Sequence, residues 1–332
     1  MAVTIKAVAL KAGVSTSAVS RTFTQGASVS SKTRAKVEAA AQALGYAPNA
    51  LASSLTTGRT KLIGLIANNF HNPLILEVFD LFTRGLQNRG LRPLLVNMSE
   101  ANDPAAALKM LRQYSVDGVI VASSTIPSSF WLTFKHANLP VVHAFGREMQ
   151  VPDVHVVGID NIACGRMAAE AVLARGYRRV GFLGGPQNAS STQDRAAGFV
   201  QALRARPEVE VSLSYASAYT FDAGRAEMQR LLASTPAEVY FCGDDLLAIG
   251  ALSAIEGAGL SVPQDIGLIG LNDMEMSRWQ NIGLTTIRQP IAEIIDAAIE
   301  LVMSTIQSPD GRPETRIFPC KLIERRTLRT LD

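Results

Sequence analysis

The chain begins with the stretch VTIKAVALKAGVSTSAVSRTFT (residues 3–24), which has the pattern of two short helices joined by a tight turn. Thr4 can cap a first helix that runs through residue 12, with apolar residues at helical spacing on one face. Gly13 supplies the backbone freedom that the turn requires, and Ser15 can cap the second helix, which runs to about residue 24. The stretch therefore predicts a helix-turn-helix.

The second of these helices has one apolar and one polar face. Val19 and Phe23 stand four residues apart, so we expect both to pack against the first helix. The opposite face carries short polar side chains and one guanidinium at the start of the helix, where helix-turn-helix proteins meet base edges in DNA. These polar residues are Thr16, Ser17, Ser20 and Arg21.

A third helix and a shorter helical segment follow. Ser30 can cap the third helix, which has a buried apolar stripe and ends at Gly45. Asn49 then caps a segment rich in Ala and Leu that ends at Leu55. Because this segment has only about two turns, it is too short to be stable alone in water, and we expect it to fold against a partner.

The charge of the chain is divided unevenly along its length. Residues 1–60 contain seven Lys and Arg against one acid, Glu38, which leaves +6 there and −3 in the rest of a chain of net charge +3. The positive excess lies with the helix-turn-helix, as contacts to DNA phosphates require. The 332 residues are 47% hydrophobic and 18% charged, which indicates a globular protein of more than one domain.

Cysteine usage and hydropathy indicate a cytoplasmic protein. Cys164, Cys242 and Cys320 are widely spaced, and no CxxC pair suggests zinc binding or redox chemistry. Lys6 and Lys11 interrupt the start before any export-length apolar run forms, and no later run is long enough to span a membrane. We expect no membrane association, no metal site and no cofactor.

Residues 56–60 are a small, polar joint between the basic head and a body of alternating elements. Strand-like runs at 62–67, 93–96, 118–122 and 141–143 alternate with helical patterns, and the pattern restarts with strands at 154–159, 180–183, 211–215, 239–242 and 266–270. The fold class is α/β, with two doubly wound lobes of parallel sheet after an all-α head. The expected domains are 1–48 (helix-turn-helix), 49–60 (hinge helix and linker) and 61–332 (the two lobes).

The sequence resembles the lactose-repressor (LacI/GalR) family of bacterial transcriptional regulators along essentially its whole length. The resemblance is carried by VTIKAVALKAGVSTSAVSR at 3–21, by VSSKTRAKVEAAAQALGYAPNALASSL at 29–55, and by LIGLI, DGVIV, RAAGF, DDLLAIGAL and LTTIRQP in the body. It implies two periplasmic-binding-protein-like lobes that close on a small effector. It also implies that the chain crosses between the lobes near 144–150, near 271–283 and near the C-terminus.

For the head, the resemblance implies a role for individual residues. Thr16, Ser17 and Arg21 match base-reading positions, and an Arg can bind the O6 and N7 atoms of guanine together. Leu55 matches a leucine that enters the minor groove at the centre of the operator and kinks the DNA. Ser53 and Thr56 stand where many relatives have Arg or Lys, so we expect weaker phosphate contacts there.

In the body, three polar residues match effector-binding positions. Arg195 can hold two ligand oxygens at once, which suits vicinal hydroxyls or a carboxylate, although an Arg that opens a helix can also form a surface salt bridge. Asp244 lies at the carboxyl end of a strand and can accept from hydroxyls, but it can equally be a helix N-cap. Asn272 matches a position at which many relatives have Asp.

Further matching positions shape the expected pocket. Three more pocket positions of the family are matched by Ser191, Tyr219 and Phe145. The two aromatic side chains can be stacking platforms for the ligand or residues of the core. His71, Leu74 and Ile75 follow the first strand, where some relatives place aromatics over the ligand. Aliphatic side chains cannot stack in this way, and Ala144 stands where several relatives have an acidic residue in the pocket. We therefore expect a pocket that favours a sugar or a sugar acid.

The helix that begins near residue 73 is apolar on more faces than one sheet can cover. A second subunit or a sandwiched position within its own lobe would cover it. The chain ends without heptads, which indicates a homodimer without a coiled-coil tetramerisation tail.

The function expected from these features is a repressor that binds palindromic double-stranded operator DNA as a homodimer and is released by a small effector. A free-standing solute-binding protein of a sugar transport system shares the two lobes but needs an export signal and no basic head. An enzyme is not expected, because the four His are scattered and no GxSxG, GxxxxGK[ST] or HExxH motif occurs. The sequence leaves open whether the effector releases the protein from DNA or tightens its binding.

Overall fold

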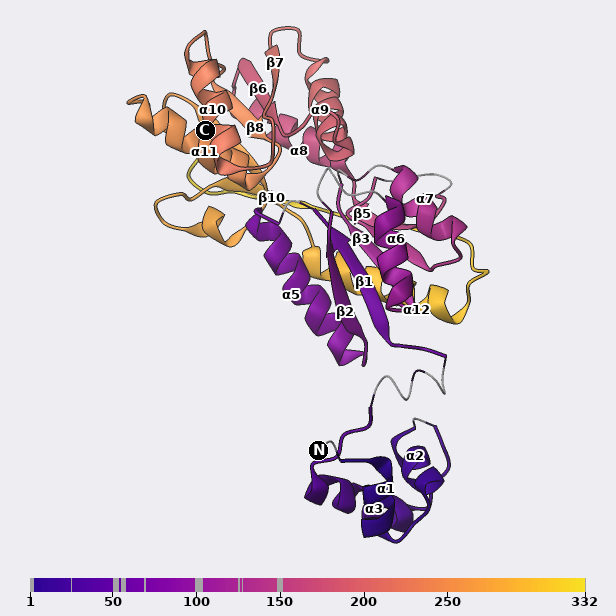
Figure 1. The fold of residues 1–332 in the computed structure, drawn as a ribbon. Coiled ribbons are helices and arrows are strands. Elements are labelled where there is room, and N and C mark those ends of the chain that lie inside the picture. Colours follow the sequence, from indigo (N-terminus) through magenta and orange to yellow (C-terminus); the bar gives the residue numbers. More distant parts are fainter. Residues whose placement is uncertain are drawn as a thin grey trace. The chain divides into compact units, whose positions relative to one another are not determined.

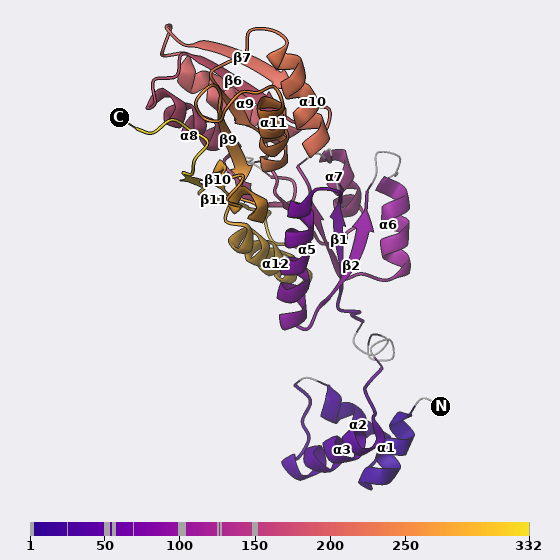
Figure 2. The ribbon, with the colours of Figure 1, turned by 90° about the vertical axis from the view of Figure 1, so that its left-hand side faces the viewer.

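The computed structural model describes residues 3–24, 26–49, 54, 58–68, 70–98, 104–124, 126, 128–147 and 152–331. The chain divides into two compact units, Met1–Lys61 and Leu62–Asp332. The first unit is helical, and the second consists of two lobes of sheet and helix (Figures 1 and 2).

The helices of the first unit are α1 (Ile5–Ala12), α2 (Thr16–Phe23) and α3 (Ser31–Leu44). Each begins at a hydroxyl that accepts a hydrogen bond from the backbone of the first turn, and these N-caps are Thr4, Ser15 and Ser30. Gly13 and Gly45 end α1 and α3 in the left-handed conformation, at φ values of 65° and 64°. The predicted caps and stops of all three helices are confirmed.

The core of this unit is small and apolar. Val8, Val19 and Val37, one from each helix, are fully buried against one another. The prediction for Phe23 is wrong, because this side chain is 38% exposed and packs beside Tyr46, with ring centroids 5.9 Å apart. Thr22 is buried instead, since α2 ends at Phe23 and the position three residues after Val19 faces the core.

The first lobe of the second unit is built on a parallel six-stranded sheet. Its strands, in spatial order, are β11 (Thr315–Phe318), β5 (His155–Ile159), β4 (Val141–Ala144), β3 (Gly118–Ala122), β1 (Leu62–Ala67) and β2 (Arg92–Asn97). Helices α5 (Pro73–Asn88) and α12 (Ile291–Gln307) pack on one face, and α6 (Pro104–Gln113) and α7 (Ser128–His136) on the other.

The second lobe repeats this plan. Its sheet has the order β12 (Lys321–Ile323), β10 (Thr285–Arg288), β9 (Gly267–Asn272), β8 (Val239–Cys242), β6 (Arg179–Gly184) and β7 (Glu210–Tyr215), and only the β10–β12 pair is antiparallel. Helices α8 (Asn161–Leu173) and α9 (Ser190–Leu203) cover one face, while α10 (Phe221–Leu232) and α11 (Asp245–Gly257) cover the other. A short 3-10 helix, η1 (Glu275–Arg278), follows β9.

Two of the three expected crossings between the lobes are wrong in position. Strands β4 and β5 pair within one sheet, so the chain does not cross near 144–150 but after β5, at residue 160. Strands β9 and β10 also pair, which moves the second crossing from 271–283 to 289–290. The third crossing, at 319–320, lies near the C-terminus as expected. The sequence pattern restarts at residues 154–159, which form β5, and this suggested that the second lobe begins there. The pairing of β5 with β4 places it in the first sheet, and such pairing between separate strands cannot be seen in the local pattern.

Helix α5 has more than one apolar face, as the sequence indicates. Val78 and Phe82 face the sheet, and α12 of the same lobe packs alongside α5, where a Cβ on Gly85 would press against Ile299 (Figure 2). Leu76 nevertheless remains 64% exposed. The lobe itself therefore covers part of the second apolar face and leaves part of it open.

Candidate functional site

The first unit presents the polar face of α2 to solvent. The predicted base-reading residues Thr16, Ser17, Ser20 and Arg21 are all exposed. The guanidinium of Arg21 makes no hydrogen bond or ion pair with any residue that the structure describes. Nη1 of Arg34 on α3 donates to Thr22 O at 2.8 Å and so ties the end of α2 to α3. This helix is therefore held in place while its polar face stays open to a partner.

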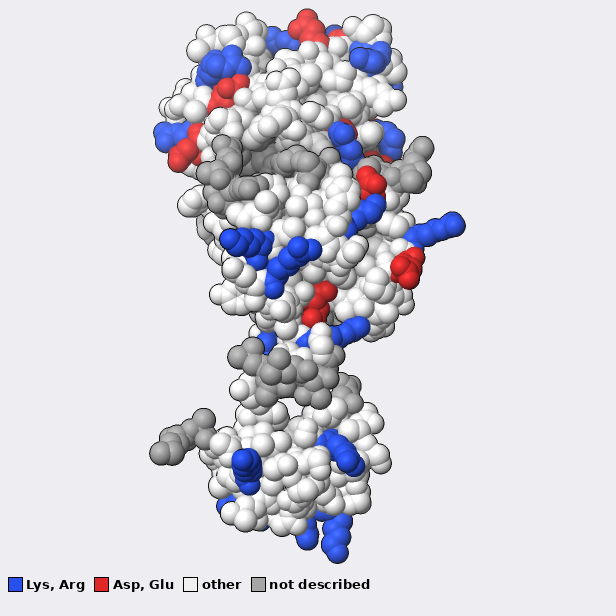
Figure 3. Space-filling view, turned by 45° about the vertical axis from the view of Figure 1, so that its right-hand side comes forward, with Lys and Arg blue, Asp and Glu red and all other residues white. Residues whose placement is uncertain are grey.

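The charge of this unit suits a polyanion. Figure 3 shows Lys and Arg, and no Asp or Glu, on the drawn face of its described part, whereas both signs are mixed on the body. The described basic residues Lys6, Lys11, Lys32 and Lys36 are all exposed. Asn49 is exposed as well, and the segment after it that the sequence assigns to a hinge helix, with Leu55, lies outside the described residues apart from Ser54. The role of Leu55 stays a prediction.

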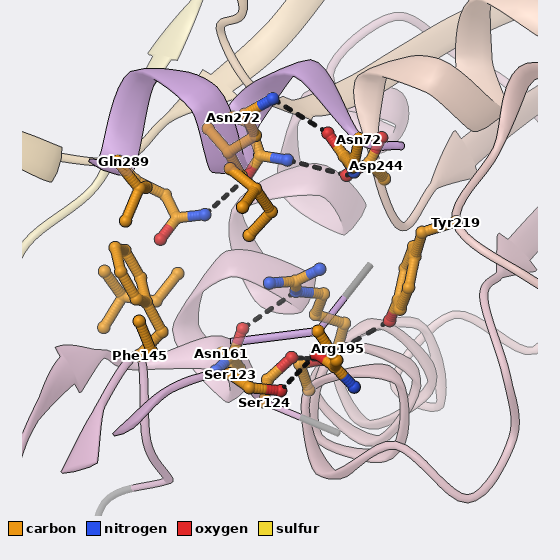
Figure 4. Close-up of a pocket in the computed structure, with 17 residues that line it drawn as sticks. Asn72, Ser123, Ser124, Phe145, Asn161, Arg195, Tyr219, Asp244, Asn272 and Gln289 are labelled. Atoms are coloured by element: carbon orange, nitrogen blue, oxygen red, sulfur yellow. Dashed lines mark hydrogen bonds between the residues drawn. The ribbon is translucent and has the colours of Figure 1, made fainter. Parts of the chain in front are cut away.

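The second unit contains a cavity of about 110 Å³ between its two lobes. It lies at the carboxyl ends of strands from both sheets, where ligands bind in doubly wound folds. Among the residues that line it are eight of the nine that the sequence singles out: Leu74, Ile75, Phe145, Ser191, Arg195, Tyr219, Asp244 and Asn272. Figure 4 shows their polar groups converging on one space.

Arg195 on α9 is buried at the base of this cavity. Its Nε donates to Asn161 Oδ1 at 2.8 Å and its Nη1 donates to Gly243 O at 2.6 Å. Gly165 of α8 lets α9 approach closely, because a Cβ there would overlap the Arg195 backbone. Both of its hydrogen-bond partners are neutral, and the nearby Asp244 carboxyl interacts with it through charge alone, since the Arg195 charge lowers the pKa of Asp244. Among the described residues Arg195 therefore does not form the surface salt bridge that was the alternative.

Asp244 lies opposite, at the N-terminus of α11, and is both a cap and a pocket residue. Its Oδ1 accepts from Leu246 N at 2.7 Å, which is the capping bond. Its Oδ2 accepts from Asn272 Nδ2 at 2.8 Å and from Asn72 Nδ2 at 3.3 Å (Figure 4). Gln289 continues this chain by donating to Asn272 Oδ1. Asp244 therefore joins the first lobe, through Asn72, to the second.

The acidic pair at 244–245 does not form a dyad. The carboxylate of Asp245 turns to Thr286 Oγ1 at 2.5 Å and Met274 N at 2.8 Å, away from the partners of Asp244. Burial raises the pKa of Asp244 to about 7, and the charge of Asp245 adds to this rise. Burial also raises the pKa of Asp245 to about 6, although Thr286 and Met274 donate to it. At neutral pH the Asp244 carboxyl is therefore only partly ionised.

Two aromatic side chains stand on either side of the cavity in Figure 4. Tyr219 OH lies 2.5 Å from Thr192 Oγ1 and 3.3 Å from Ser191 Oγ, which fixes the ring. Phe145 follows β4 with a φ of 62°, a strained value for a bulky residue. Leu74 and Ile75 line the cavity with aliphatic surface, at the positions where the resemblance places aromatics in some relatives. The walls therefore combine apolar faces with polar edges.

The structure places His71 outside this site. Its side chain is exposed and does not line the cavity, because Asn72 caps α5 and takes the buried position at the end of the first loop. Six further polar residues line the cavity that the sequence motifs do not mark as a site: Asn68, Asn72, Ser123, Ser124, Asn161 and Gln289. All but Gln289 follow strand-like runs of the sequence, and this position at a strand's carboxyl end is the signal that could have found them; Gln289 follows β10, which the apolar pattern does not mark.

The described residues form neither a metal site nor a membrane-spanning helix. No group of three or more His, Cys, Asp or Glu in the described ranges is arranged to hold a metal ion. Over the same part of the chain, every helix is too short or too polar to cross a bilayer.

Two family models match separate parts of the chain. Residues 4–49 match the family model described as bacterial regulatory proteins, lacI family, and residues 169–328 match that of a periplasmic binding protein-like domain. The chain is 32% identical over 337 residues to the HTH-type transcriptional repressor CytR of Escherichia coli (strain K12), covering 99% of this chain and 97% of CytR. This chain belongs to the LacI family of bacterial regulatory proteins.

Solved structures agree with this membership. A complex of the transcriptional regulator CelR with cellobiose is 27% identical, with a TM-score of 0.74 over 98% of this chain and 99% of that one. The Lac repressor bound to ONPG in its repressed state is 25% identical, with a TM-score of 0.86 over 98% and 100%. The expected α/β fold with two lobes is thus confirmed, and LacI-family membership makes the protein a DNA-binding transcriptional regulator with an effector-binding body.

Proposed function

We propose that this protein represses transcription as a homodimer on a roughly palindromic operator and that a sugar or sugar acid, bound between the lobes, releases it. The observation that carries the proposal is the buried guanidinium of Arg195, which faces a cavity shared by two lobes. That cavity belongs to a chain whose first unit is a basic helix-turn-helix.

The ligand class follows from the donors and acceptors in the cavity. Arg195 uses Nε and one hydrogen of Nη1 on Asn161 and Gly243, so both hydrogens of Nη2 and the second of Nη1 remain for a ligand. Asn68, Asn72 and Gln289 add amide groups that both donate and accept. Sugar hydroxyls do the same, and a carboxylate suits a guanidinium whose hydrogen-bond partners in the described part of the chain are both neutral. CelR, which has this fold, was solved with cellobiose.

The route from ligand to DNA runs through contacts between the lobes. Asn72 Nδ2 donates to Asp244 Oδ2 at 3.3 Å, and Ser191 Oγ donates to Ser124 Oγ at 3.2 Å; each bond joins the first lobe to the second beside the cavity. A ligand that takes over these polar groups changes the relative stability of the open and closed arrangements. Because the hinge helix is too short to fold alone, a shift of the lobe that follows it in the chain would unfold the hinge and weaken DNA binding.

The homodimer supplies what a single copy lacks. A second copy brings a second recognition helix, and two heads about one helical turn apart read adjacent major grooves. It also offers a partner for the short hinge segment and a cover for the exposed Leu76 on α5. The guanidinium of Arg21 and the hydroxyls of Thr16 and Ser17 then face base edges in each half-site.

The test has two parts and uses the purified full-length protein. Thermal-shift screening against sugars, sugar acids and nucleobases should give stabilisation by a member of the first two classes. Duplexes selected from a random library should share a palindrome, and the stabilising ligand should lower affinity for it, measured by fluorescence anisotropy. Selection of no common sequence would contradict the proposed DNA binding, and stabilisation by nucleobases alone would contradict the ligand class.

A further inference from the structure

The chain leaves β9 through two residues with positive φ. Asn272, the last residue of the strand, has a φ of 126°, and Asp273, the next residue, has a φ of 59°. Asn and Asp adopt the left-handed region near 60° more readily than other residues with a side chain, but 126° lies outside that region. A backbone of this kind persists only where the surrounding structure holds it.

The carboxylate of Asp273 is fully buried and ties the turn to three other parts of the second lobe. Its Oδ1 accepts from Arg325 Nη2 at 2.6 Å, and its Oδ2 accepts from Arg288 Nε at 2.6 Å and from Arg278 Nη2 at 3.3 Å. Ser277 Oγ also donates to Oδ1, at 3.1 Å. These partners lie on β10, on η1 and in the segment after β12, so one carboxylate joins all three to the turn.

The three guanidiniums depend on this carboxylate for their neutralisation. Burial alone would raise the pKa of Asp273, but the hydrogen bonds from Arg325 and Arg288 hold it below its usual value, so the carboxyl is ionised. Removal of its charge would leave three like charges close together. Their repulsion would then separate the elements that the carboxylate joins.

The same turn directs Asn272 into the cavity between the lobes. Arg288 lies opposite Asn272 in the ladder between β9 and β10, and the next residue, Gln289, donates to Asn272 Oδ1 (Figure 4). Asn272 and Gln289 line the cavity, whereas Asp273 and Arg288 do not. Two side-chain pairs therefore join the ends of these strands, an amide pair inside the cavity and an ion pair away from it.

The residue after the turn is fixed by a different group. Asp245 Oδ2 accepts from the backbone N–H of Met274, the N-cap of η1, at 2.8 Å. On the other side, Asn272 belongs to the paired end of β9. Asp273 therefore lies between a paired strand end and a fixed helix start, and its own carboxylate holds the conformation that links them.

We propose that Asp273 is a positioning residue for the effector: through its arginine partners it fixes the turn after β9, so that the Asn272 amide faces the cavity and Asp244. The inference rests on the proposed function, because the effector is the molecule that this amide meets. Beyond its bonds to Asp244 and Gln289, Asn272 keeps one N–H and one lone pair of Oδ1, and a ligand hydroxyl can use both. Asp273 does not touch the ligand and acts through its neighbour.

The first test measures how fast the side-chain amide of Asn272 exchanges its hydrogens with water, by NMR of the full-length protein without added ligand. The signal is identified by its absence from Asn272→Ala. In Asp273→Asn, which keeps the size of the side chain and removes its charge, exchange should be about tenfold faster, because the amide is no longer held on Asp244. The Asn161 amide, in the same cavity, is the internal reference and should keep its wild-type rate.

The reference and a matched variant separate positioning from stability. A role in stability alone would speed exchange at Asn161 and Asn272 equally, or at neither, and either result would overturn the inference. Asp265→Asn removes another carboxylate of the second lobe, which accepts from Ser261 N at 2.7 Å, and should leave the Asn272 rate unchanged.

A milder variant keeps the test decisive should Asp273→Asn fail to fold. Arg288→Gln removes one partner at 2.6 Å, and this arginine is 47% exposed. It should also speed exchange at Asn272, whereas Arg230→Gln, which breaks an ion pair with Glu227 on α10, should not. Wild-type exchange in a folded Arg288→Gln would overturn the inference.

The second test asks whether Asp273 acts through Asn272. Ribose, cellobiose and gluconate are titrated calorimetrically, and the one that binds the wild type most tightly is the probe. Asp273→Asn should weaken its binding about tenfold in the wild-type chain and cause no further loss in Asn272→Ala. Equal losses in both backgrounds would overturn the inference. If the wild type binds none of the three, this counts against the proposed ligand class, and the exchange rates still decide the role of Asp273.

Discussion

Replacing Arg195 by alanine removes the one guanidinium among the described residues that line the cavity, and it should abolish the response to the effector while DNA binding persists. The residue is 7% exposed, and two of its N–H groups bind Asn161 Oδ1 and Gly243 O. The remaining N–H groups on Nη1 and Nη2 form a fork that can bind two ligand oxygens together. The alanine variant removes both functions, the internal bonds and the fork.

The two losses differ in size. Each hydrogen bond from a charged donor to the ligand is worth about 1.5–3 kcal/mol, so two of them amount to about 3–6 kcal/mol. Because each ~1.4 kcal/mol is tenfold in affinity, Kd should rise by at least ~100-fold. Loss of the two internal hydrogen bonds leaves the acceptors Asn161 Oδ1 and Gly243 O unpaired, which costs about 1–3 kcal/mol of folding stability each. Removal of a buried charge offsets part of this cost. The body should therefore remain folded but lose ligand binding.

The assay compares Arg195→Ala with Arg204→Ala, an exposed arginine that ends the same helix. Circular dichroism establishes that both are folded, and fluorescence anisotropy with the selected operator measures DNA binding with and without ligand. Both variants should bind operator like the wild type, and only Arg204→Ala should be released by ligand. Release of Arg195→Ala at the wild-type ligand concentration would refute the assignment of this pocket.

Three further changes test other parts of the structure. Arg21→Ala should weaken binding to the selected operator by about 1–3 kcal/mol and weaken binding to a scrambled duplex by less, as measured by fluorescence anisotropy at fixed salt. If the variant keeps the wild-type preference for the operator over the scrambled duplex, Arg21 does not read bases. Burial raises the pKa of Asp244 to about 7, so the folded protein binds a proton that the unfolded chain releases near pH 4, and this group's contribution to stability falls as pH rises from about 4 through 7. Relative to Asp244→Asn, the wild type should therefore gain thermal stability from pH 8 to pH 5, and parallel curves would count against the raised pKa. Arg147 binds Asp194 across the lobes through two hydrogen bonds of 2.6 and 2.7 Å. A partly exposed pair of this kind is worth about 0.2–1 kcal/mol, so Arg147→Ala should change ligand affinity by at most about fivefold, whereas Arg84→Ala on the surface of α5 should leave it unchanged.

Local patterns predicted the elements well because their causes lie within a few residues. Thr4, Ser15 and Ser30 cap the three helices of the first unit as hydroxyls at such positions usually do. Most strand bounds in the body differ from the predicted runs by one or two residues, since alternating apolar runs and helical periodicity mark them. The prediction for Phe23 was wrong because it used local spacing alone. Its spacing from Val19 suits a core position, but Phe23 is the last residue of α2 and remains exposed.

Helix caps, the α/β alternation and the basic head were therefore determined by the sequence alone, because each depends on neighbours along the chain. Strand partners were decided only by the tertiary structure: β5 belongs to the first sheet because it pairs with β4 and β11. The same long-range packing brought Asn72 of the first lobe to Asp244 of the second. No spacing in the sequence encodes such contacts, since they arise where the ends of separate strands meet.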